Sequence, residues 1–129
     1  LPVIACMVYD SGRNKDRTMM GITPEQAAGA LLGSGASIVG ANCGQGIEGF
    51  ITICRRLKAA TNRPVWIKAN AGLPEIENEK AIYRTTAEQF ASHAGALSEA
   101  GAGFIGGCCG TDPQFIAALR KEILHEVNA

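Results

Sequence analysis

The sequence has no excess of charge of either sign and no long apolar run. Acidic and basic residues number 12 each, so we do not expect a nucleic-acid or membrane-surface partner. No apolar stretch approaches the roughly 20 residues that cross a bilayer. The chain has 129 residues, 47% of them hydrophobic, which is enough for one domain with its own core. We therefore expect residues 1–129 to form a single domain.

The chain also lacks the marks of a secreted protein. No signal peptide precedes the first apolar segment, and five cysteines, an odd number, do not suit a framework of disulfides. These absences favour free thiols and a cytoplasmic location. The chain begins with Leu1-Pro2 and enters an apolar segment at once, so we expect it to be cut from a larger protein.

Two kinds of active-site motif are missing as well. Residues 40–46 are rich in glycine, but they lack the GxGxxG spacing of a nucleotide-binding loop. A cysteine nucleophile needs a base close to it, and both histidines, His93 and His125, fall in predicted helices away from the strand ends. We therefore discount a nucleotide site, and we place a cysteine nucleophile behind the other hypotheses.

What the sequence does contain is an apolar strand followed by a helix, four times over. The predicted strands are 3–9, 36–41, 64–69 and 103–107, and the predicted helices are 24–32, 47–60, 86–100 and 113–127. Each crossover is long enough to be right-handed, which makes the sheet parallel. Four such units predict an α/β fold, a (βα)4 unit that is half of a TIM-type (βα)8 barrel. A flavodoxin-like open sheet is the alternative, although it normally has five strands.

Several smaller expectations concern single segments. Residues 75–85 are polar and show no regular period. Cys6 and Cys54 are interpreted as small buried hydrophobic residues. Other side chains are expected to face solvent, namely Arg55, Arg56 and Lys58. The last helix is expected to bury Ile116, Leu119, Ile123 and Val127.

Three cysteines follow the ends of predicted strands. Cys43 comes after the second strand, and Cys108 and Cys109 come after the fourth, directly before a helix that Asp112 can cap. The carboxyl ends of parallel strands meet at one edge, where α/β proteins place their chemistry. Three thiolates around one ion, with a fourth position open, are typical of a catalytic zinc site. Incidental core or redox cysteines remain the alternative at this point.

Three motifs, taken together, resemble a known family. They are Gly40-Ala41-Asn42-Cys43, Lys68-Ala69-Asn70-Ala71-Gly72-Leu73-Pro74 and Gly106-Gly107-Cys108-Cys109-Gly110-Thr111. Together they resemble the homocysteine S-methyltransferase family, and within it most of all the homocysteine-binding module of the cobalamin-dependent methionine synthases. The resemblance covers essentially the whole chain, in order.

The resemblance implies a function. It implies that Cys43, Cys108 and Cys109 hold Zn²⁺, that homocysteine sulfur takes the open position, and that a methyl group is transferred to it to give methionine. The implied donor is methylcobalamin on a partner domain or protein, recharged from methyltetrahydrofolate; betaine or S-methylmethionine is the alternative. Asn42 is the candidate for binding the polar end of homocysteine, and Asn70 for shaping the mouth of the site. Without the resemblance, each asparagine could equally be a turn residue.

The resemblance also places the chain within the barrel. It matches the carboxyl-terminal half, and the Asp-Gly-Ala-Met-Gly-Thr-like turn of the first half is absent. A lone half-barrel would expose two strand edges. We therefore expect a partner, either an amino-terminal half-barrel or a second copy of this chain. A non-catalytic, zinc-binding half-barrel is the second hypothesis.

Overall fold

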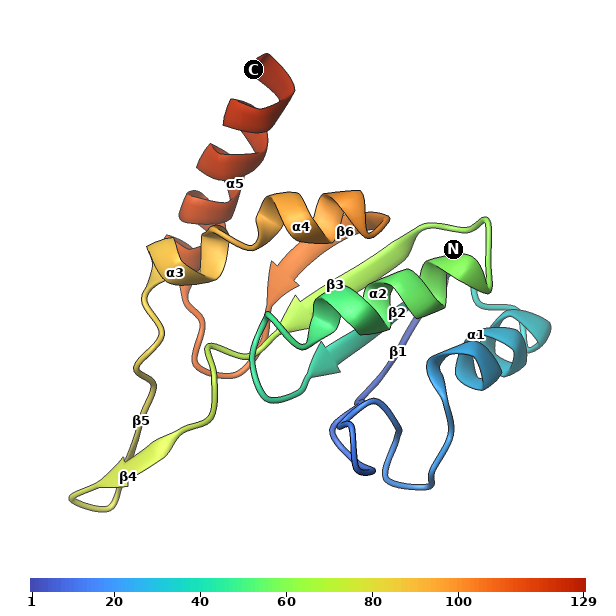
Figure 1. The fold of residues 1–129 in the computed structure, drawn as a ribbon, viewed down its shortest axis with the longest axis horizontal. Coiled ribbons are helices and arrows are strands. Elements are labelled where there is room, and N and C mark those ends of the chain that lie inside the picture. The colour runs from blue at the N-terminus through green and yellow to red at the C-terminus, as the bar shows by residue number, and fades with distance from the viewer.

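Four parallel strands form the sheet around which the chain folds. The structure is a computed structural model that describes residues 1–129 (Figure 1). The strands of the sheet are β1 (Ile4–Met7), β2 (Ile38–Cys43), β3 (Val65–Ala69) and β6 (Ala102–Gly107). The helices are α1 (Pro24–Gly33), α2 (Phe50–Ala59), α3 (Ala87–Ala91), α4 (Ala94–Glu99) and α5 (Pro113–Asn128). A separate antiparallel hairpin joins β4 (Glu75–Glu77) to β5 (Lys80–Ile82).

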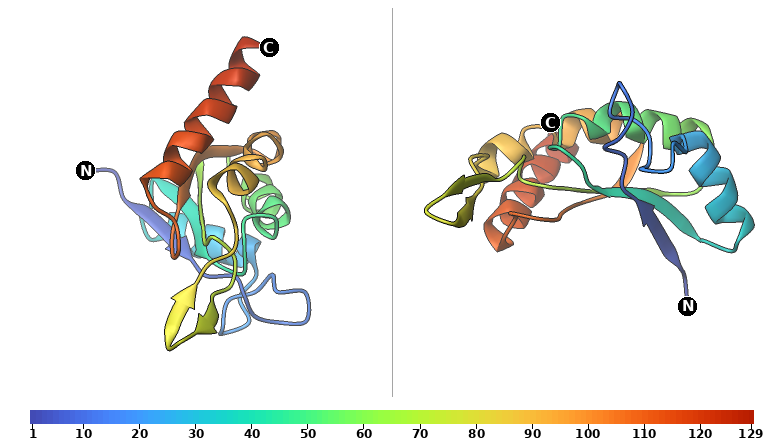
Figure 2. Two further views of the ribbon diagram at one scale, coloured as in Figure 1. Left: turned by 90° about the vertical axis from the view of Figure 1, so that its left-hand side faces the viewer. Right: turned by 90° about the horizontal axis from the view of Figure 1, so that it is seen from below.

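The strand order and the placement of the helices decide between the two predicted folds. The sheet runs β1-β2-β3-β6, so every strand lies beside the next strand along the chain, without the reversal of order found in a flavodoxin-like sheet. Helices α1, α2 and α4 lie over the same face (Figure 2, right). A doubly wound sheet would carry helices on both faces. The predicted (βα)4 half of a barrel is therefore confirmed.

The two faces of the sheet have different surroundings. Side chains that point toward the helices are fully buried, as at Val39, Val65 and Ile67. The opposite face carries Trp66, whose ring stacks on that of Phe104 with the centroids 5.0 Å apart. We call this second side the open face. It corresponds to the interior of a closed barrel, where side chains from neighbouring strands pack in layers.

The hairpin was not predicted. Its turn residues, Asn78 and Glu79, both have positive φ, so they form the tight two-residue turn that suits twisted strands. The sequence pattern that usually predicts such a turn is Asn-Gly. Here the two turn residues are Asn-Glu, so the sequence did not indicate a hairpin. Arg84, which follows β5, forms ion pairs with Glu75 and Glu77 of β4 and thereby links the two sides of the hairpin. The hairpin projects from the end of the sheet at which the strands finish (Figure 1).

The predicted helices needed correction in two places. The predicted helix 86–100 is two short helices, α3 and α4, which are separated at Ser92 and His93. In α5 the buried residues are Phe115 and Leu119, whereas Ile116 is 49% exposed and Val127 is 76% exposed. The expectation for these last two residues was wrong. In the first turn of α5, Phe115 rather than Ile116 points inward, where its ring packs edge-on against that of Phe90 in α3. Val127 lies at the carboxyl-terminal end of α5, which extends past the sheet and has little to pack against (Figure 1).

Arg56 is not the solvated side chain that the sequence predicted. Its guanidinium forms two hydrogen bonds to the carboxylate of Glu25, at 2.6 and 2.8 Å, and a third to Asp16 at 2.6 Å. These contacts join α2 to the start of α1 and to the loop after β1. The hydrogen bond from Arg56 lowers the pKa of Glu25 to about 2, from an ordinary value of 4.5.

No helix of the protein combines the length and hydrophobicity that crossing a bilayer requires.

The ion pair between Glu25 and Arg56 should make stability depend on pH. Because the pKa of Glu25 is about 2 in the folded protein, its contribution is complete above about pH 5 and is lost as the pH falls toward 2. Glu25→Gln should therefore lower the free energy of unfolding by about 1 kcal/mol at pH 7, a modest value because solvent screens the pair. The loss should shrink at pH 3. Urea unfolding at both values tests this, with Glu122→Gln on an exposed face of α5 as the control. An equal loss at pH 7 and pH 3 would contradict it.

Candidate metal centre

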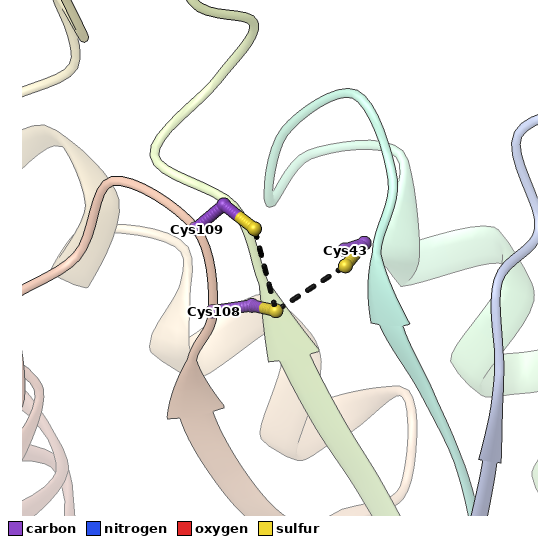
Figure 3. Close-up of side chains that lie close together, drawn as sticks. All are labelled: Cys43, Cys108 and Cys109. Carbon is purple, nitrogen blue, oxygen red and sulfur yellow. Dashed lines mark hydrogen bonds between the residues drawn. The ribbon is translucent and has the colours of Figure 1, made fainter.

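Three cysteine sulfurs converge at the carboxyl edge of the sheet. The Sγ atoms of Cys43 and Cys108 are 3.3 Å apart, those of Cys108 and Cys109 are 4.0 Å apart, and all three lie within 4.8 Å of one another (Figure 3). Cys43 ends β2, and the other two follow β6. Because β3 lies between these strands in the sheet, the cluster spans the end of β3. The structure thus brings together the three residues that the sequence singled out.

The end of β2 turns sharply at Cys43. Cys43 has a φ of +62°, in the left-handed region, and Gly44 follows with +72°. A residue with a side chain pays about 1–2 kcal/mol for this conformation. At Gly44 there is no room for a side chain, because a Cβ atom would lie 2.7 Å from the ring of Phe50. The strained turn is therefore specified by its surroundings, as is common at functional sites.

The turn after β6 is fixed by hydrogen bonds and by close packing. The backbone N–H of Cys108 donates to the carbonyl of Ala69 at 2.8 Å, which continues the pairing of β3 with β6. The hydroxyl of Thr111 donates to the carbonyl of Cys108 at 2.7 Å. At Gly110, where φ is +79°, a Cβ would collide with the ring of Tyr83. Tyr83 was overlooked in the sequence, because it belongs to the polar stretch 75–85 that shows no period.

The two candidate asparagines have different environments. Asn42 is half-buried, and its amide nitrogen lies 3.4 Å from the sulfur of Cys43. Asn70 is 9% exposed and lies between the two cysteine-bearing segments, with hydrogen bonds to both. Contact of either residue with a substrate remains a prediction.

The remaining cysteines and the histidines lie apart from the cluster. All five cysteines are free. Cys54 is completely buried, as predicted, and burial raises its pKa to about 11. Cys6 is only half-buried, so the expectation of a buried residue was wrong for it; it lies on the open face, where its sulfur approaches Gly40. The Nδ1 atom of His93 is hydrogen-bonded to the carbonyl oxygen of Gln89, and His125 is exposed.

The charge state of the cluster follows from these contacts. The hydrogen bond to Cys108, together with burial, raises the pKa of Cys43 to about 11. Burial alone would raise the pKa of Cys108, but the hydrogen bonds that its sulfur accepts from Cys43 and from nearby backbone N–H groups outweigh burial and lower it. The lowered pKa favours the thiolate at Cys108, and a hydrogen bond links its sulfur to that of Cys43, whose pKa is raised.

The spacing of the sulfurs fits a zinc ion. Tetrahedral coordination with Zn–S bonds of about 2.3 Å places sulfurs about 3.8 Å apart. The sulfur separations of 3.3 and 4.0 Å, with none above 4.8 Å, bracket that value. Three thiolates are donors that favour zinc over magnesium or calcium. Cys43, Cys108 and Cys109 could thus hold one zinc ion and leave a fourth position open.

Comparison with known proteins identifies the family. The sequence model of homocysteine S-methyltransferases matches residues 1–123. The chain belongs to the homocysteine S-methyltransferase family. The resemblance found in the three motifs is thereby confirmed.

Individual members of the family resemble the chain over most of its length. Methionine synthase of Mycobacterium tuberculosis is 32% identical over 117 residues, which are 81% of this chain and 10% of that protein. S-methylmethionine–homocysteine S-methyltransferase BHMT2 of Pongo abelii is 30% identical over 129 residues, with 84% of this chain and 34% of that protein covered. The chain thus spans about one tenth of the first of these relatives and about one third of the second.

Solved structures of the family share the fold. The metallated form of the homocysteine methyltransferase MmuM of Escherichia coli superimposes with a TM-score of 0.65 at 26% identity, covering 84% of this chain and 32% of that one. Its apo form gives a TM-score of 0.66 at 26% identity and covers 87% of this chain and 37% of that one. The chain therefore has the fold of about one third of these homocysteine methyltransferases.

The packing of Tyr83 against Gly110 can be tested by substitution. Gly110→Ala should lower the free energy of unfolding by more than the 1–2 kcal/mol of a left-handed residue, because the new methyl group also displaces the ring of Tyr83. The matched control is Gly29→Ala, since Gly29 lies inside α1 with open space around it; this change should raise stability by about 0.5–1 kcal/mol. Urea unfolding measures both. Equal effects of the two substitutions would contradict the proposed packing.

Proposed function

We propose that residues 1–129 form one unit that binds zinc and homocysteine in an enzyme transferring a methyl group to the homocysteine thiol, giving methionine. The observation that carries the proposal is the cluster of three cysteine sulfurs at the carboxyl edge of the sheet, in a chain that belongs to this family. Cys43, Cys108 and Cys109 would hold the zinc ion. A zinc ion in such a site supplies a position at which a substrate thiol loses its proton at neutral pH.

The residues around the cluster support this chemistry. The amide of Asn42 points an N–H toward the sulfur of Cys43, which favours the thiolate that a metal needs. Its second N–H would be available for the polar end of homocysteine. In the reaction, the sulfur of homocysteine forms a bond to the methyl carbon while the bond between that carbon and the donor breaks. The thiol proton leaves to solvent.

The methyl donor is a separate part of the proposal. The motif resemblance supports methylcobalamin, carried by a partner domain or protein and recharged from methyltetrahydrofolate. The names of two relatives point to other donors, since they are a betaine- and an S-methylmethionine-dependent enzyme. An assay of the intact enzyme with each of the three donors distinguishes these possibilities. A cytoplasmic location remains part of the proposal.

The open face supports the proposal that a partner completes the barrel. Ile4 and Phe104 lie on this face and are each 43% exposed. The indole Nε1 of Trp66 is buried there without a hydrogen-bond partner. Outer strands β1 and β6 each have one unpaired edge. An amino-terminal half-barrel or a second copy of the chain would cover these groups. A non-catalytic half-barrel is the alternative.

Cysteine substitutions test the assignment of the cluster. In the intact enzyme, Cys43→Ala, Cys108→Ala and Cys109→Ala should each lose zinc and abolish methyl transfer to homocysteine, because each removes one of three ligands. Cys54→Ala is the matched control. It should keep zinc and activity and lower only stability, since Cys54 lies in the core. Zinc content and product formation are measured for all four. Zinc loss in Cys54→Ala with retention in Cys108→Ala would show that the ligands are wrongly assigned.

The open face predicts association when residues 1–129 are prepared alone. Exposed apolar side chains and unpaired strand edges should drive the formation of a dimer or a larger species. Sedimentation equilibrium over a hundredfold range of concentration measures this. Phe104→Glu should weaken the association, whereas Leu124→Glu, which alters a side chain of similar exposure on α5, should not. A well-folded monomer at every concentration would contradict the need for a partner.

A further inference from the structure

A glycine-rich loop joins β2 to α2 and lines a cavity that the proposed function does not use. Its residues, Gly44-Gln45-Gly46-Ile47-Glu48-Gly49, have the GxGxxG spacing that residues 40–46 lack. The loop lies between the carboxyl end of a parallel strand and the first turn of a helix, which is where this spacing binds phosphate groups. We propose that the loop binds the phosphate group of a small organic ligand, at a site separate from the cysteine cluster.

The cavity lies between this loop, the loop after β1 and the start of α2. Its volume is about 430 Å³, within the range of roughly 300–1,000 Å³ that is typical of small-molecule sites. The three glycines of the motif contribute to its lining, and Tyr9, Lys15 and Asp16 contribute from the loop after β1. The carboxylate of Asp16 accepts a hydrogen bond from Arg56 of α2 at 2.6 Å. This contact holds the loop after β1 against α2, so the cavity is part of the folded structure.

The backbone of the glycine loop offers hydrogen-bond donors that the fold does not use. None of the N–H groups of residues 44–49 donates to a backbone carbonyl of the protein. Gly44 and Gly46 have φ of +72° and +148°, a conformation that residues with side chains rarely adopt. The N-cap of α2 is Gly49, which has no side chain to bind the first N–H groups of the helix. Free N–H groups at the positive end of a helix favour an anion.

Tyr9 gives a second, independent indication of a ligand. It is 2% exposed, and its hydroxyl is buried without a hydrogen-bond partner, although the residue lines the cavity. A buried hydroxyl in this state lowers stability, so it indicates a partner that the chain itself does not supply. Burial, with smaller effects of Cys6 and Glu25, raises the pKa of Tyr9 to about 12. The hydroxyl therefore keeps its proton at neutral pH and can donate to a phosphate oxygen, directly or through a bound water molecule.

The charges around the cavity suit an anion. Lys15 is exposed and takes part in none of the ion pairs of the protein, so its ammonium group is available to a ligand. The charge of Asp16 is offset by Arg56. The carboxylate of Glu48, although it belongs to the glycine loop, lies 3.8 Å from His93 and does not line this cavity.

The apolar lining indicates what the phosphate group is attached to. Phe50 and Ile53 of α2 line the cavity and are 1% and 3% exposed. Together with the ring of Tyr9 they form an apolar wall beside the glycine loop. A dinucleotide site would also need an acidic residue after the next strand to bind a ribose, and Asn70 takes that place after β3. The ligand class is therefore a phosphate monoester with an aromatic or other apolar body.

The test measures anion binding to the intact protein by isothermal titration calorimetry. Phenyl phosphate is the main probe; inorganic phosphate lacks its apolar body, and benzoate replaces its phosphate with a carboxylate. Lys15→Gln and Tyr9→Phe change the proposed site, and Lys121→Gln on the exposed face of α5 is the matched control. Cys109→Ala serves as a second control, because a phosphate bound to a metal ion at the cluster would depend on Cys109.

We expect phenyl phosphate to bind more tightly than inorganic phosphate and at least about tenfold more tightly than benzoate. Lys15→Gln should weaken its binding about tenfold, because a hydrogen bond to a charged group is lost. Tyr9→Phe should weaken it about fivefold and should not lower the Tm of the ligand-free protein, because the hydroxyl has no partner there. Binding should be unchanged in Lys121→Gln and Cys109→Ala. These results would support the inference.

Four results would overturn it. They are no binding of phenyl phosphate at millimolar concentration, equal affinity for benzoate, wild-type affinity in both Lys15→Gln and Tyr9→Phe, and loss of binding in Cys109→Ala with retention in Lys15→Gln. The last would place the anion at the metal centre. The inference does not rest on the proposed function, and none of these results bears on the zinc content that tests that function.

Discussion

The parallel pairing of β2, β3 and β6 is the constraint on which the rest of the structure depends. Cys43 pairs with Ala69, and Ala69 pairs with Gly107, so the three strands end at one level. The sulfurs of Cys43 and Cys108 are 65 residues apart in sequence and 3.3 Å apart in space because of this register. A shift by one residue would turn alternate side chains to the other face. The chemistry at the edge is therefore a consequence of the sheet.

The candidate site lies on one half of a barrel, and metal binding and closure of the barrel involve different parts of this half. The carboxyl edge of the sheet supplies the thiols and the asparagines. The open face carries side chains of the kind that line a barrel interior, but only the half of that interior that these four strands provide. The three cysteines that would hold a metal ion are held in place by hydrogen bonds with Asn70, Ala69 and Thr111. Metal binding should depend on this half alone, while catalysis should require whatever closes the barrel.

Much of this arrangement could be predicted, since it follows from local patterns. The strands and the positions of the cysteines are encoded within short segments. So are two of the helix starts, where the structure shows a capping box at Thr23 and another at Thr86. Tertiary contacts decided the rest. The hydrogen bonds of Asn70 and the ion pairs of Arg56 join residues that are far apart in sequence, so spacing gave no sign of them. The buried face of α5 depended on its packing against α3 and α4, which the helix pattern does not contain.

The central claim is that three thiolates at this edge bind one zinc ion, and X-ray absorption at the zinc edge tests it most directly. In the reduced, metal-replete intact protein, the account predicts one zinc per chain with three sulfur neighbours from the protein at about 2.3 Å. The same measurement on Cys109→Ala should show fewer sulfur neighbours or no bound zinc. A wild-type protein without zinc, or one whose zinc is surrounded by oxygen and nitrogen alone, would contradict the account.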